Sequence, residues 1–341
     1  MSKVVFGICG CGMIARYHAQ AIQAVPNAEL LGACSYSFSS AEAFCKETNT
    51  RPFASYEEML ACDEINAVSI CSPSGDHAQQ VLSALRAGKH VVVEKPMCIT
   101  LEDADEIIRT ADETGLKVCS ISQLRFSDSI QELKRAIEAG EFGKLHSAAL
   151  TMRYLRTQEY YDSAAWRGTW EKDGGGVLMN QGIHGIDMLC YLLGPAHEIC
   201  GFAQTMGHTI EVEDVAVAAV RFENGAMATI DASTCCAPGF PKKIVLSGEN
   251  GTAVLEEDAV TLWTLPTPCR LKLGQISGSS GASDPKGITC ANHTRQFANF
   301  VDAVLNGAKL ISDAREGKLP LEIILGVYQS SNEGKRVTFE H

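Results

Sequence analysis

A glycine-containing turn near the N-terminus has the residues needed to hold a phosphate-bearing cofactor. Gly10-Cys11-Gly12-Met13-Ile14-Ala15 follows the apolar stretch Val4–Cys9 and precedes an amphipathic segment that predicts a helix. Gly10 permits the tight turn, Gly12 lets the backbone approach a pyrophosphate, and Ala15 keeps the helix close to the sheet. The helix N-terminus offers N–H groups and positive dipole to the phosphates. We therefore expect a dinucleotide site with contributions from Gly10, Gly12, Met13 and Ile14.

The end of the second expected strand bears on which nicotinamide cofactor binds. An acidic residue at this position ordinarily binds the ribose hydroxyls of NAD. This chain has Cys34-Ser35-Tyr36-Ser37-Phe38-Ser39 there, with no carboxylate before Glu42. The hydroxyls of Ser35 and Ser37 suit either cofactor, and no arginine stands there to favour a 2′-phosphate. The sequence therefore leaves NAD and NADP both open.

Lys95 and His184 are the side chains best suited to proton transfer. Lys95 comes directly after an apolar strand and Glu94. A lysine at a strand's carboxyl end, beside a cofactor and partly desolvated, is suited to acid–base work, although surface lysines are commoner. Asn180 and His184 are four residues apart on an expected helix and so project from one face; His184 as a neutral core histidine is the alternative. Asp187 either orients His184 or is structural.

The first third of the chain alternates apolar strands with amphipathic helices, which builds a parallel sheet covered on both faces. The expected strands are Val4–Cys9, Leu30–Cys34, Ala67–Cys71, His90–Val93 and Lys117–Ile121. The expected helices are Met13–Val25, Ser40–Thr48, His77–Ala87 and Leu101–Glu113. This pattern predicts an α/β Rossmann domain over residues 1–123.

After residue 123 the pattern changes to that of an α+β domain, expected to cover residues 124–341. The expected strands, mainly antiparallel, are Leu145–Arg153, Val212–Arg221, Ala226–Ser233, Lys243–Ser247 and Thr252–Leu255. The expected helices are Ser129–Ala139, Val177–Leu193, Thr294–Asn306 and Gly317–Asn332. The Gly/Ser/Pro-rich stretch 266–289 predicts a surface loop, with a lid or a subunit contact as alternatives.

Three further segments carry a family resemblance. They are Ser72-Pro73-Ser74-Gly75-Asp76-His77, the stretch 87–96 ending in Glu94-Lys95-Pro96, and the stretch 174–187 containing Asn180 and His184. With the glycine turn they make the chain resemble the Gfo/Idh/MocA family, which includes inositol dehydrogenases and glucose–fructose oxidoreductases. The resemblance implies a Rossmann domain followed by a domain with a large open sheet used for homo-oligomer contacts, so we expect a homodimer or homotetramer.

The resemblance also implies an NAD(P)-dependent dehydrogenase acting on a CH–OH group of a sugar, polyol or derivative. Lys95 is then the acid–base residue with His184 assisting. Cofactor contacts are implied at Ser72, Pro73, His77, Glu94 and Lys95. Many family members carry Asp where this chain has Asn180, so a carboxylate–histidine relay from that position is absent here. A non-catalytic nicotinamide-binding sensor and a reductase of another C=X bond, such as an imine, are the alternatives.

A segment rich in aromatic and polar residues, 160–170, offers a surface for a sugar. Sugars present apolar C–H faces to aromatic rings and hydroxyls to planar polar groups. Tyr161, Trp166 and Arg167 are the expected lining residues, together with Lys95, Asn180 and His184; loop packing is the alternative for the aromatic segment. Arg125 and Arg153 are candidates to hold a phosphate or carboxylate, unless they are ordinary surface arginines.

Composition excludes several other classes of protein. The net charge of −12 disfavours a nucleic-acid or anionic-membrane partner, since both need a basic surface. No apolar run approaches the length of a membrane helix and no secretory signal opens the chain, so we expect a cytoplasmic protein. The 14 cysteines are scattered without a C-x-x-C pair, which predicts free thiols and no metal site.

Overall fold

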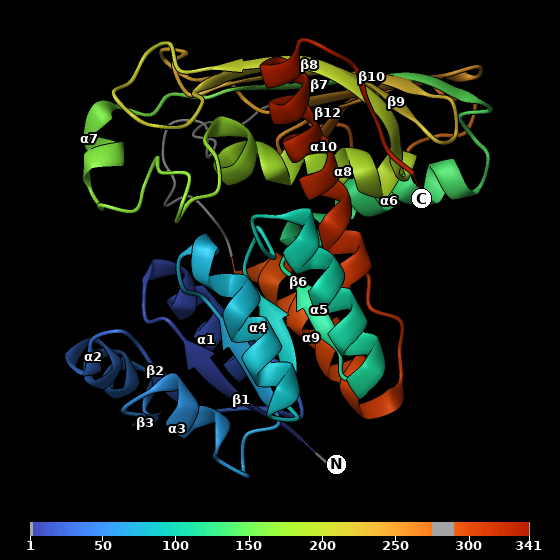
Figure 1. Ribbon diagram of the computed structural model, residues 1–341. Helices are drawn as coiled ribbons and strands as arrows, with labels where there is room; N and C mark the ends of the chain where they lie inside the picture. The colour runs from blue at the N-terminus through green and yellow to red at the C-terminus, as the bar shows by residue number, and fades with distance from the viewer. Residues whose placement is uncertain (1–2, 275–289, 341) are drawn as a thin grey trace. The chain divides into compact units, whose positions relative to one another are not determined.

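The computed structural model describes residues 3–274 and 290–340, shown in Figure 1. The described chain forms two compact units. One consists of residues 3–123 and 290–318, and the other of residues 124–274 and 319–340. Most of the predicted loop 266–289 lies outside the described residues, so the expectation of a lid or subunit contact there stays a prediction.

The first unit is built on a parallel sheet with the strand order β3-β2-β1-β4-β5-β6. Its strands are β1 (Val4–Cys9), β2 (Ala28–Cys34), β3 (Arg51–Pro52), β4 (Ala67–Ile70), β5 (His90–Val93) and β6 (Val118–Ser120). Its helices include α1 (Met13–Ala24), α2 (Phe38–Thr48), α3 (Tyr56–Leu60), η1 (Ser74–Asp76), α4 (His77–Arg86) and α5 (Leu101–Thr114). This is the Rossmann order, which confirms the predicted fold and places the dinucleotide crevice at the carboxyl ends of β1 and β4.

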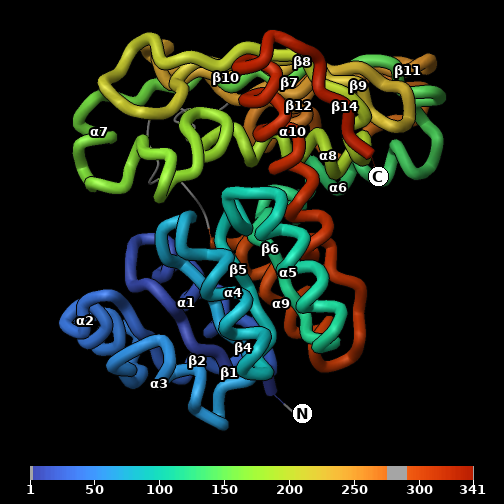
Figure 2. The backbone as a smooth tube through the Cα atoms, viewed as in Figure 1, coloured from blue at the N-terminus to red at the C-terminus, as the bar shows by residue number. Residues whose placement is uncertain are grey.

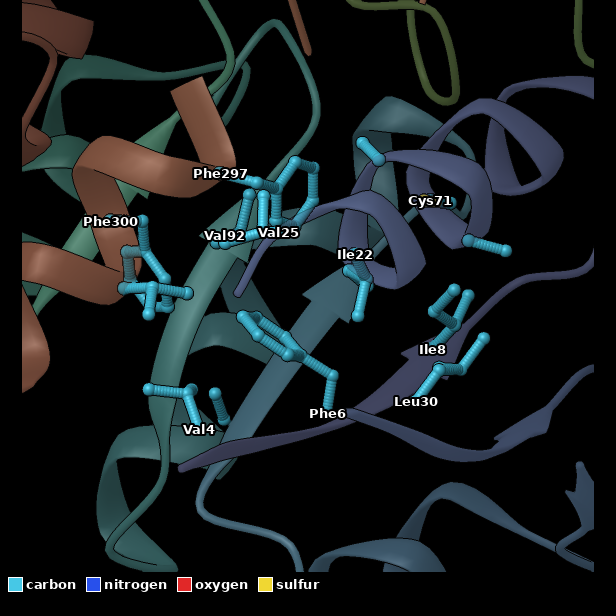
Figure 3. Close-up of a cluster of buried hydrophobic side chains, with 14 of the residues drawn as sticks. Val4, Phe6, Ile8, Ile22, Val25, Leu30, Cys71, Val92, Phe297 and Phe300 are labelled. Atoms are coloured by element: carbon cyan, nitrogen blue, oxygen red, sulfur yellow. The ribbon is translucent and has the colours of Figure 1, made fainter. Parts of the chain in front are cut away.

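The core of this unit includes a helix from far along the chain. Phe297 and Phe300 of α9 (Ala291–Asn306) pack on Phe6 of β1, with ring centroids 5.7 and 5.8 Å away (Figure 3). All three phenylalanines are fully buried. The first unit therefore gains residues 290–318, whereas the sequence analysis places all of 124–341 in the second domain. Local pattern predicts that α9 is an amphipathic helix but not which sheet its apolar face covers.

The second unit is built on an eight-stranded sheet in the order β13-β12-β11-β7-β10-β9-β8-β14. Its strands are β7 (Leu145–Arg153), β8 (Ala196–Gln204), β9 (Val215–Phe222), β10 (Met227–Ser233), β11 (Lys243–Gly248), β12 (Gly251–Glu256), β13 (Ala259–Trp263) and β14 (Val337–Thr338). β7 and β10 pair in parallel, and the other strand pairs described are antiparallel. The predicted α+β domain with a large, mainly antiparallel sheet is confirmed.

Helices cover one face of this sheet (Figure 2). They include α6 (Asp128–Glu138), α8 (Ile183–Leu193) and the later turns of α10 (Ala314–Glu333), while α7 (Gln158–Asp162) is a short helix in the following loop region. A Cβ atom at Gly185 would lie 2.7 Å from the side chains of Leu150 and Met152, so α8 lies directly on the inward side of β7. The side chains on the inner face of β7 therefore pack against α8.

The predicted helix Val177–Leu193 is two elements. Residues Val177–Gly182 form a π-helix, η3, which continues into α8. A π-helix places more residues in each turn than an α-helix, so the relation between Asn180 and His184 departs from the α-helical spacing we expected. Short π segments of this kind occur frequently at functional sites.

Two expectations about the whole chain have structural counterparts. The cysteines are free thiols, and half of them are buried. Among the helices of residues 3–274 and 290–340, none has the length and apolar character that crossing a membrane requires.

Candidate functional site

The geometry of the glycine turn fits a dinucleotide. Gly10 has a φ of +91°, and a Cβ atom there would lie 2.7 Å from the backbone of Cys71, so only glycine fits between β1 and β4. A Cβ atom at Gly12 would meet nothing within 4 Å. Gly12 is the N-cap of α1, whose first turn has neither a side-chain cap nor an acidic residue. Backbone N–H groups and open space therefore meet at the helix N-terminus, as a pyrophosphate requires.

A buried histidine that sequence analysis did not single out supports the turn that carries Lys95. His18 of α1 lies 2.9 Å from a Glu94 carboxylate oxygen through Nε2 and 2.7 Å from the Ser69 hydroxyl through Nδ1. Burial raises the pKa of Glu94, but His18 and the charge of Lys95 outweigh burial and lower the pKa to about 2. The other Glu94 oxygen accepts a hydrogen bond from the Lys95 backbone N–H at 3.1 Å. Glu94 thus ties α1 to the Lys95 backbone.

His77 fixes the same turn from a second side. Its Nδ1 lies 2.7 Å from the Pro96 carbonyl oxygen and its Nε2 lies 2.9 Å from the Ser72 carbonyl oxygen. The side chain is 1% exposed, and burial lowers its pKa. His77, a predicted cofactor contact, therefore joins the Ser72-Pro73 turn to the Lys95-Pro96 turn from inside the protein.

The ribose end of the cofactor site holds a carboxylate that the local sequence does not supply. Ser35 is half-buried, and the hydroxyls of Ser37 and Ser39 lie 2.7 Å apart. Tyr36 is 83% exposed and donates a hydrogen bond of 2.9 Å to the carboxylate of Asp76, which belongs to η1 after β4. The strand order therefore brings an acidic group to the end of β2 from another strand.

In the second unit, the glycines 174–176 let the chain approach two buried side chains before η3. A Cβ atom at Gly175 would lie 2.2 Å from the Tyr328 hydroxyl, and one at Gly176 would lie 1.7 Å from the Glu213 carbonyl oxygen. The Glu213 carboxylate accepts hydrogen bonds of 2.8 Å from the N–H groups of Gly176 and Leu178, and one of 2.9 Å from Tyr328. Glu213 thereby fixes the start of the helix that carries Asn180.

Glu213 also gives a prediction about pH. Burial raises its pKa to about 7, although hydrogen bonds from Leu178 and Gly176 act in the opposite direction. A carboxyl whose folded-state pKa lies above its unfolded value of 4.5 stabilises the folded state fully below that value and loses the contribution as the pH rises through 7. We expect the free energy of unfolding to fall by about 3 kcal/mol from this group between pH 4.5 and 7.

Urea unfolding across this pH range, followed by tryptophan fluorescence, measures the effect. In Glu213→Gln, one backbone N–H that bonds the carboxylate would face the N–H of the new amide. We expect the variant's free energy of unfolding to lie below that of wild type at every pH and to change less with pH. Curves that stay parallel for the two proteins would contradict the assignment.

Asn180 is held by a carboxylate. Its side-chain amide donates a hydrogen bond of 2.9 Å to Asp173, whose other oxygen accepts one of 2.9 Å from the Gly168 backbone N–H. Asp173 is 4% exposed. His184, on the first turn of α8, is half-buried. This chain has no carboxylate at position 180, but the Asp173 carboxylate is hydrogen-bonded to the Asn180 side chain.

The aromatic segment forms a cluster in which Tyr160 has the central place. The Arg167 guanidinium lies 4.6 Å from the Tyr160 ring centroid and 4.5 Å from that of Trp166, and its Nη1 donates a 2.9 Å hydrogen bond to the Tyr160 hydroxyl. Gln181 of η3 donates to the same hydroxyl at 3.4 Å. The structure therefore brings Trp166 and Arg167 toward the helix of Asn180.

Tyr161 faces a different part of the unit. It is 6% exposed, its hydroxyl lies 2.9 Å from that of Thr234, and its ring packs on His208 at 4.8 Å. Burial raises the pKa of its hydroxyl above the usual value. These contacts give Tyr161 the loop-packing role that was the alternative in the sequence analysis.

The two remaining arginines are held by carboxylates. Arg153 is exposed on the outer face of the sheet, opposite to α8, and pairs with Asp231. Arg125 is fully buried and binds both oxygens of Asp187 at distances of 2.7 to 3.1 Å. These positions argue against Arg153 and Arg125 as anion ligands, and they give Asp187 a structural partner.

Sequence analysis did not identify several residues of these sites. They are His18, Asp173, Tyr160, Gln181 and Glu213. Gln181 adjoins Asn180, and Tyr160 adjoins Tyr161. Which residue of each pair faces the cluster depends on how the helix that carries it is oriented. Glu213 stands before Asp214 in a segment that looks like ordinary strand edge, and its partners come from distant residues.

Comparisons with known proteins agree with both units. Residues 4–122 match the model of the GFO/IDH/MocA oxidoreductase family with an NAD-binding Rossmann fold, and residues 130–254 match the GFO/IDH/MocA C-terminal domain. The structure is similar to that of the WlbA dehydrogenase from Bordetella pertussis in complex with NADH and UDP-GlcNAcA, with 32% identity, a TM-score of 0.88 and 99% of each chain covered.

Two curated dehydrogenases match at lower identity. The D-glucoside 3-dehydrogenase of Escherichia coli is 27% identical over 98% of this chain and 97% of its own length. The myo-inositol 2-dehydrogenase of Thermotoga maritima is 26% identical over 72% of this chain and 73% of its own length.

Proposed function

Since this chain belongs to the Gfo/Idh/MocA family of NAD-binding oxidoreductases, we propose that it transfers a hydride between NAD(P) and a secondary hydroxyl of a sugar or sugar derivative, with Lys95 as acid–base residue and His184 assisting. The enzyme is an NAD(P)-dependent dehydrogenase of the sugar and polyol type. The observation that carries the proposal for Lys95 is the anchoring of its turn by Glu94 and His77 at the carboxyl end of β5, the neighbour of β4 in the sheet.

The proposed chemistry assigns one task to each group. A bound nicotinamide would supply the acceptor for the hydride of the carbinol carbon, and the hydride donor in the reverse direction. The Lys95 amine takes the hydroxyl proton as the carbon–oxygen double bond forms, and returns it when a ketone is reduced. The imidazole of His184 bonds the same oxygen and orients it. Asn180, oriented by Asp173, donates to a neighbouring hydroxyl, which fixes the substrate ring.

The experiment that tests this function follows the absorbance of reduced nicotinamide. Purified protein is mixed with NAD or NADP and with inositols, glucosides, uronic acids, sugar phosphates and UDP-GlcNAcA. The reverse reaction is run with deuterated cofactor and either keto-sugars or imines. We expect reduction of the cofactor with at least one sugar and stereospecific transfer of deuterium to the matching ketone. Transfer to imines alone would replace the proposed reaction.

We also propose that the outer face of the eight-stranded sheet joins copies of this chain. Large apolar side chains stand on neighbouring strands of that face, with Phe202 65%, Val217 45% and Met227 57% exposed. Phe202 and Val217 are opposite each other in the β8–β9 pairing. An apolar patch of this kind on a sheet typically marks a protein interface.

Placing a charge in the centre of this patch should break the assembly. We expect Phe202→Asp to convert a dimer or tetramer to smaller species, because a carboxylate cannot be buried there without a partner. Light scattering after size-exclusion chromatography measures the mass. Thr229→Asp, on the exposed side of β10 like Met227, tests how far the interface extends. A wild-type protein that is already a monomer at micromolar concentration would contradict the proposal that this surface joins copies of the chain.

A further inference from the structure

Arg167 is a partly buried cation of the aromatic cluster. The residue is half-buried and stacks between Tyr160 and Trp166. Within residues 3–274 and 290–340, no carboxylate forms an ion pair with it, whereas Arg125, Arg135 and Arg153 of the same unit each have one. A partly desolvated guanidinium favours an anionic partner, and its planar donors match carboxylate and phosphate oxygens.

Two neighbouring polar groups have unused hydrogen-bonding capacity. The Tyr160 hydroxyl already accepts from Arg167 and Gln181, so its own O–H can donate to a third group. Gln181 is 7% exposed, and in the described structure neither its Oε1 nor the Nε of Arg167 has a hydrogen-bond partner. Because buried polar atoms are nearly always paired, these donors and this acceptor point to a bound molecule.

A second guanidinium lies close to the same aromatic ring. The Arg156 guanidinium lies 5.5 Å from the centroid of the Tyr160 ring that Arg167 also faces. Two cations therefore meet one aromatic ring in a chain whose net charge is −12. An anionic group gains more from this arrangement than a neutral hydroxyl does, since hydrogen bonds between a guanidinium and an ionised acceptor are about twice as strong.

We propose that Arg167, Tyr160 and Gln181 form a subsite for an anionic group of the substrate, a carboxylate or a phosphate. The anion accepts from Arg167 and from the Tyr160 hydroxyl, and a neighbouring substrate hydroxyl donates to the Gln181 Oε1. Gln181 adjoins Asn180 and precedes His184 by one turn of helix, so the anion is carried on the same sugar that the proposed function oxidises. The inference rests on that function and narrows its substrates to acidic sugars.

The test compares charged and neutral forms of one sugar. Initial rates with D-glucuronate, D-glucose 6-phosphate and UDP-GlcNAcA are set against D-glucose and methyl glucoside in wild type, Arg167→Met and Tyr160→Phe. Arg109→Met, which removes an exposed arginine of the first unit, is the matched control. Calorimetric binding of UDP-GlcNAcA in the presence of NADH gives a readout that needs no turnover.

We expect wild type to prefer at least one charged sugar, and Arg167→Met to lower kcat/KM for it about 10- to 100-fold through KM, as loss of a charged hydrogen bond implies. Rates with neutral sugars should not change, Arg167→Lys should recover part of the loss, and Arg109→Met should behave as wild type. The carboxylate and phosphate arms identify which anion is bound.

Several results would overturn the subsite. One is equal loss for charged and neutral sugars in Arg167→Met together with a lower melting temperature, which indicates a loop-packing role. Another is unchanged UDP-GlcNAcA binding in both Arg167→Met and Tyr160→Phe. Charged sugars that bind through Arg167 without any cofactor reduction would instead leave the subsite standing and remove the proposed function.

Discussion

Replacing Lys95 with methionine is expected to reduce kcat about a thousandfold or more while leaving the binding of NAD(P) nearly unchanged. Proton transfer by a positioned side chain contributes about 10²- to 10⁴-fold, and methionine fills the same space without a proton-accepting atom. Glu94 holds the turn through the backbone N–H of residue 95, which the substitution retains. The loss should therefore fall on the chemical step.

Stopped-flow absorbance at the wavelength of reduced nicotinamide separates this step from release of product. Cofactor affinity is measured by fluorescence titration with NADH. Lys3→Met removes an exposed lysine that pairs with Glu29 and serves as the control. Turnover of the Lys95 variant at the wild-type rate would rule out Lys95 as the acid–base residue, and loss of cofactor binding would give it a binding role instead.

The second large effect concerns stability rather than catalysis. Asp187→Asn is expected to lower the free energy of unfolding by about 3–5 kcal/mol, since it leaves the buried Arg125 charge without its bidentate carboxylate. Arg125 is fully buried and Asp187 is 4% exposed, so water does not replace the lost partner. The Arg125 guanidinium also lies 4.8 Å from the centroid of the Tyr191 ring, which supplies no negative charge to replace the carboxylate.

Urea denaturation monitored by circular dichroism measures the loss. Asp112→Asn breaks the exposed pair with Arg315, whose side chains are more than half exposed, and should change stability by about 1 kcal/mol or less. A variant at Asp187 that keeps full stability but shifts the pH profile of kcat would show instead that Asp187 orients His184.

The cofactor half of the site was predictable from local sequence. Gly10 and Gly12 have the backbone geometry that their spacing predicts, because a strand, a tight turn and a helix are consecutive and need no distant partner. The same holds for the position of Lys95 after β5. Short-range steric rules decide these features, and a single sequence contains them.

The substrate half was predictable only in outline. Sequence analysis grouped Tyr161, Trp166 and Arg167 with Asn180 as expected sugar-lining residues, but in the structure Tyr160 rather than Tyr161 contacts Arg167. Adjacent residues of a short helix point in different directions, and the packing of Tyr161 on His208 decides which one faces inward. Composition cannot supply that choice.

The sequence by itself determined the glycine turn, the strand–helix alternation, the Lys95 turn and the excess of acidic residues that disfavours nucleic acid. Only the tertiary structure decided which groups became partners: His18 with Glu94, Arg125 with Asp187, and Arg167 with Tyr160. It also placed α9 on the first sheet through Phe297 and Phe300. The physical reason is that partners more than a few residues apart are selected by burial and charge compensation over the whole fold, which a local pattern does not record.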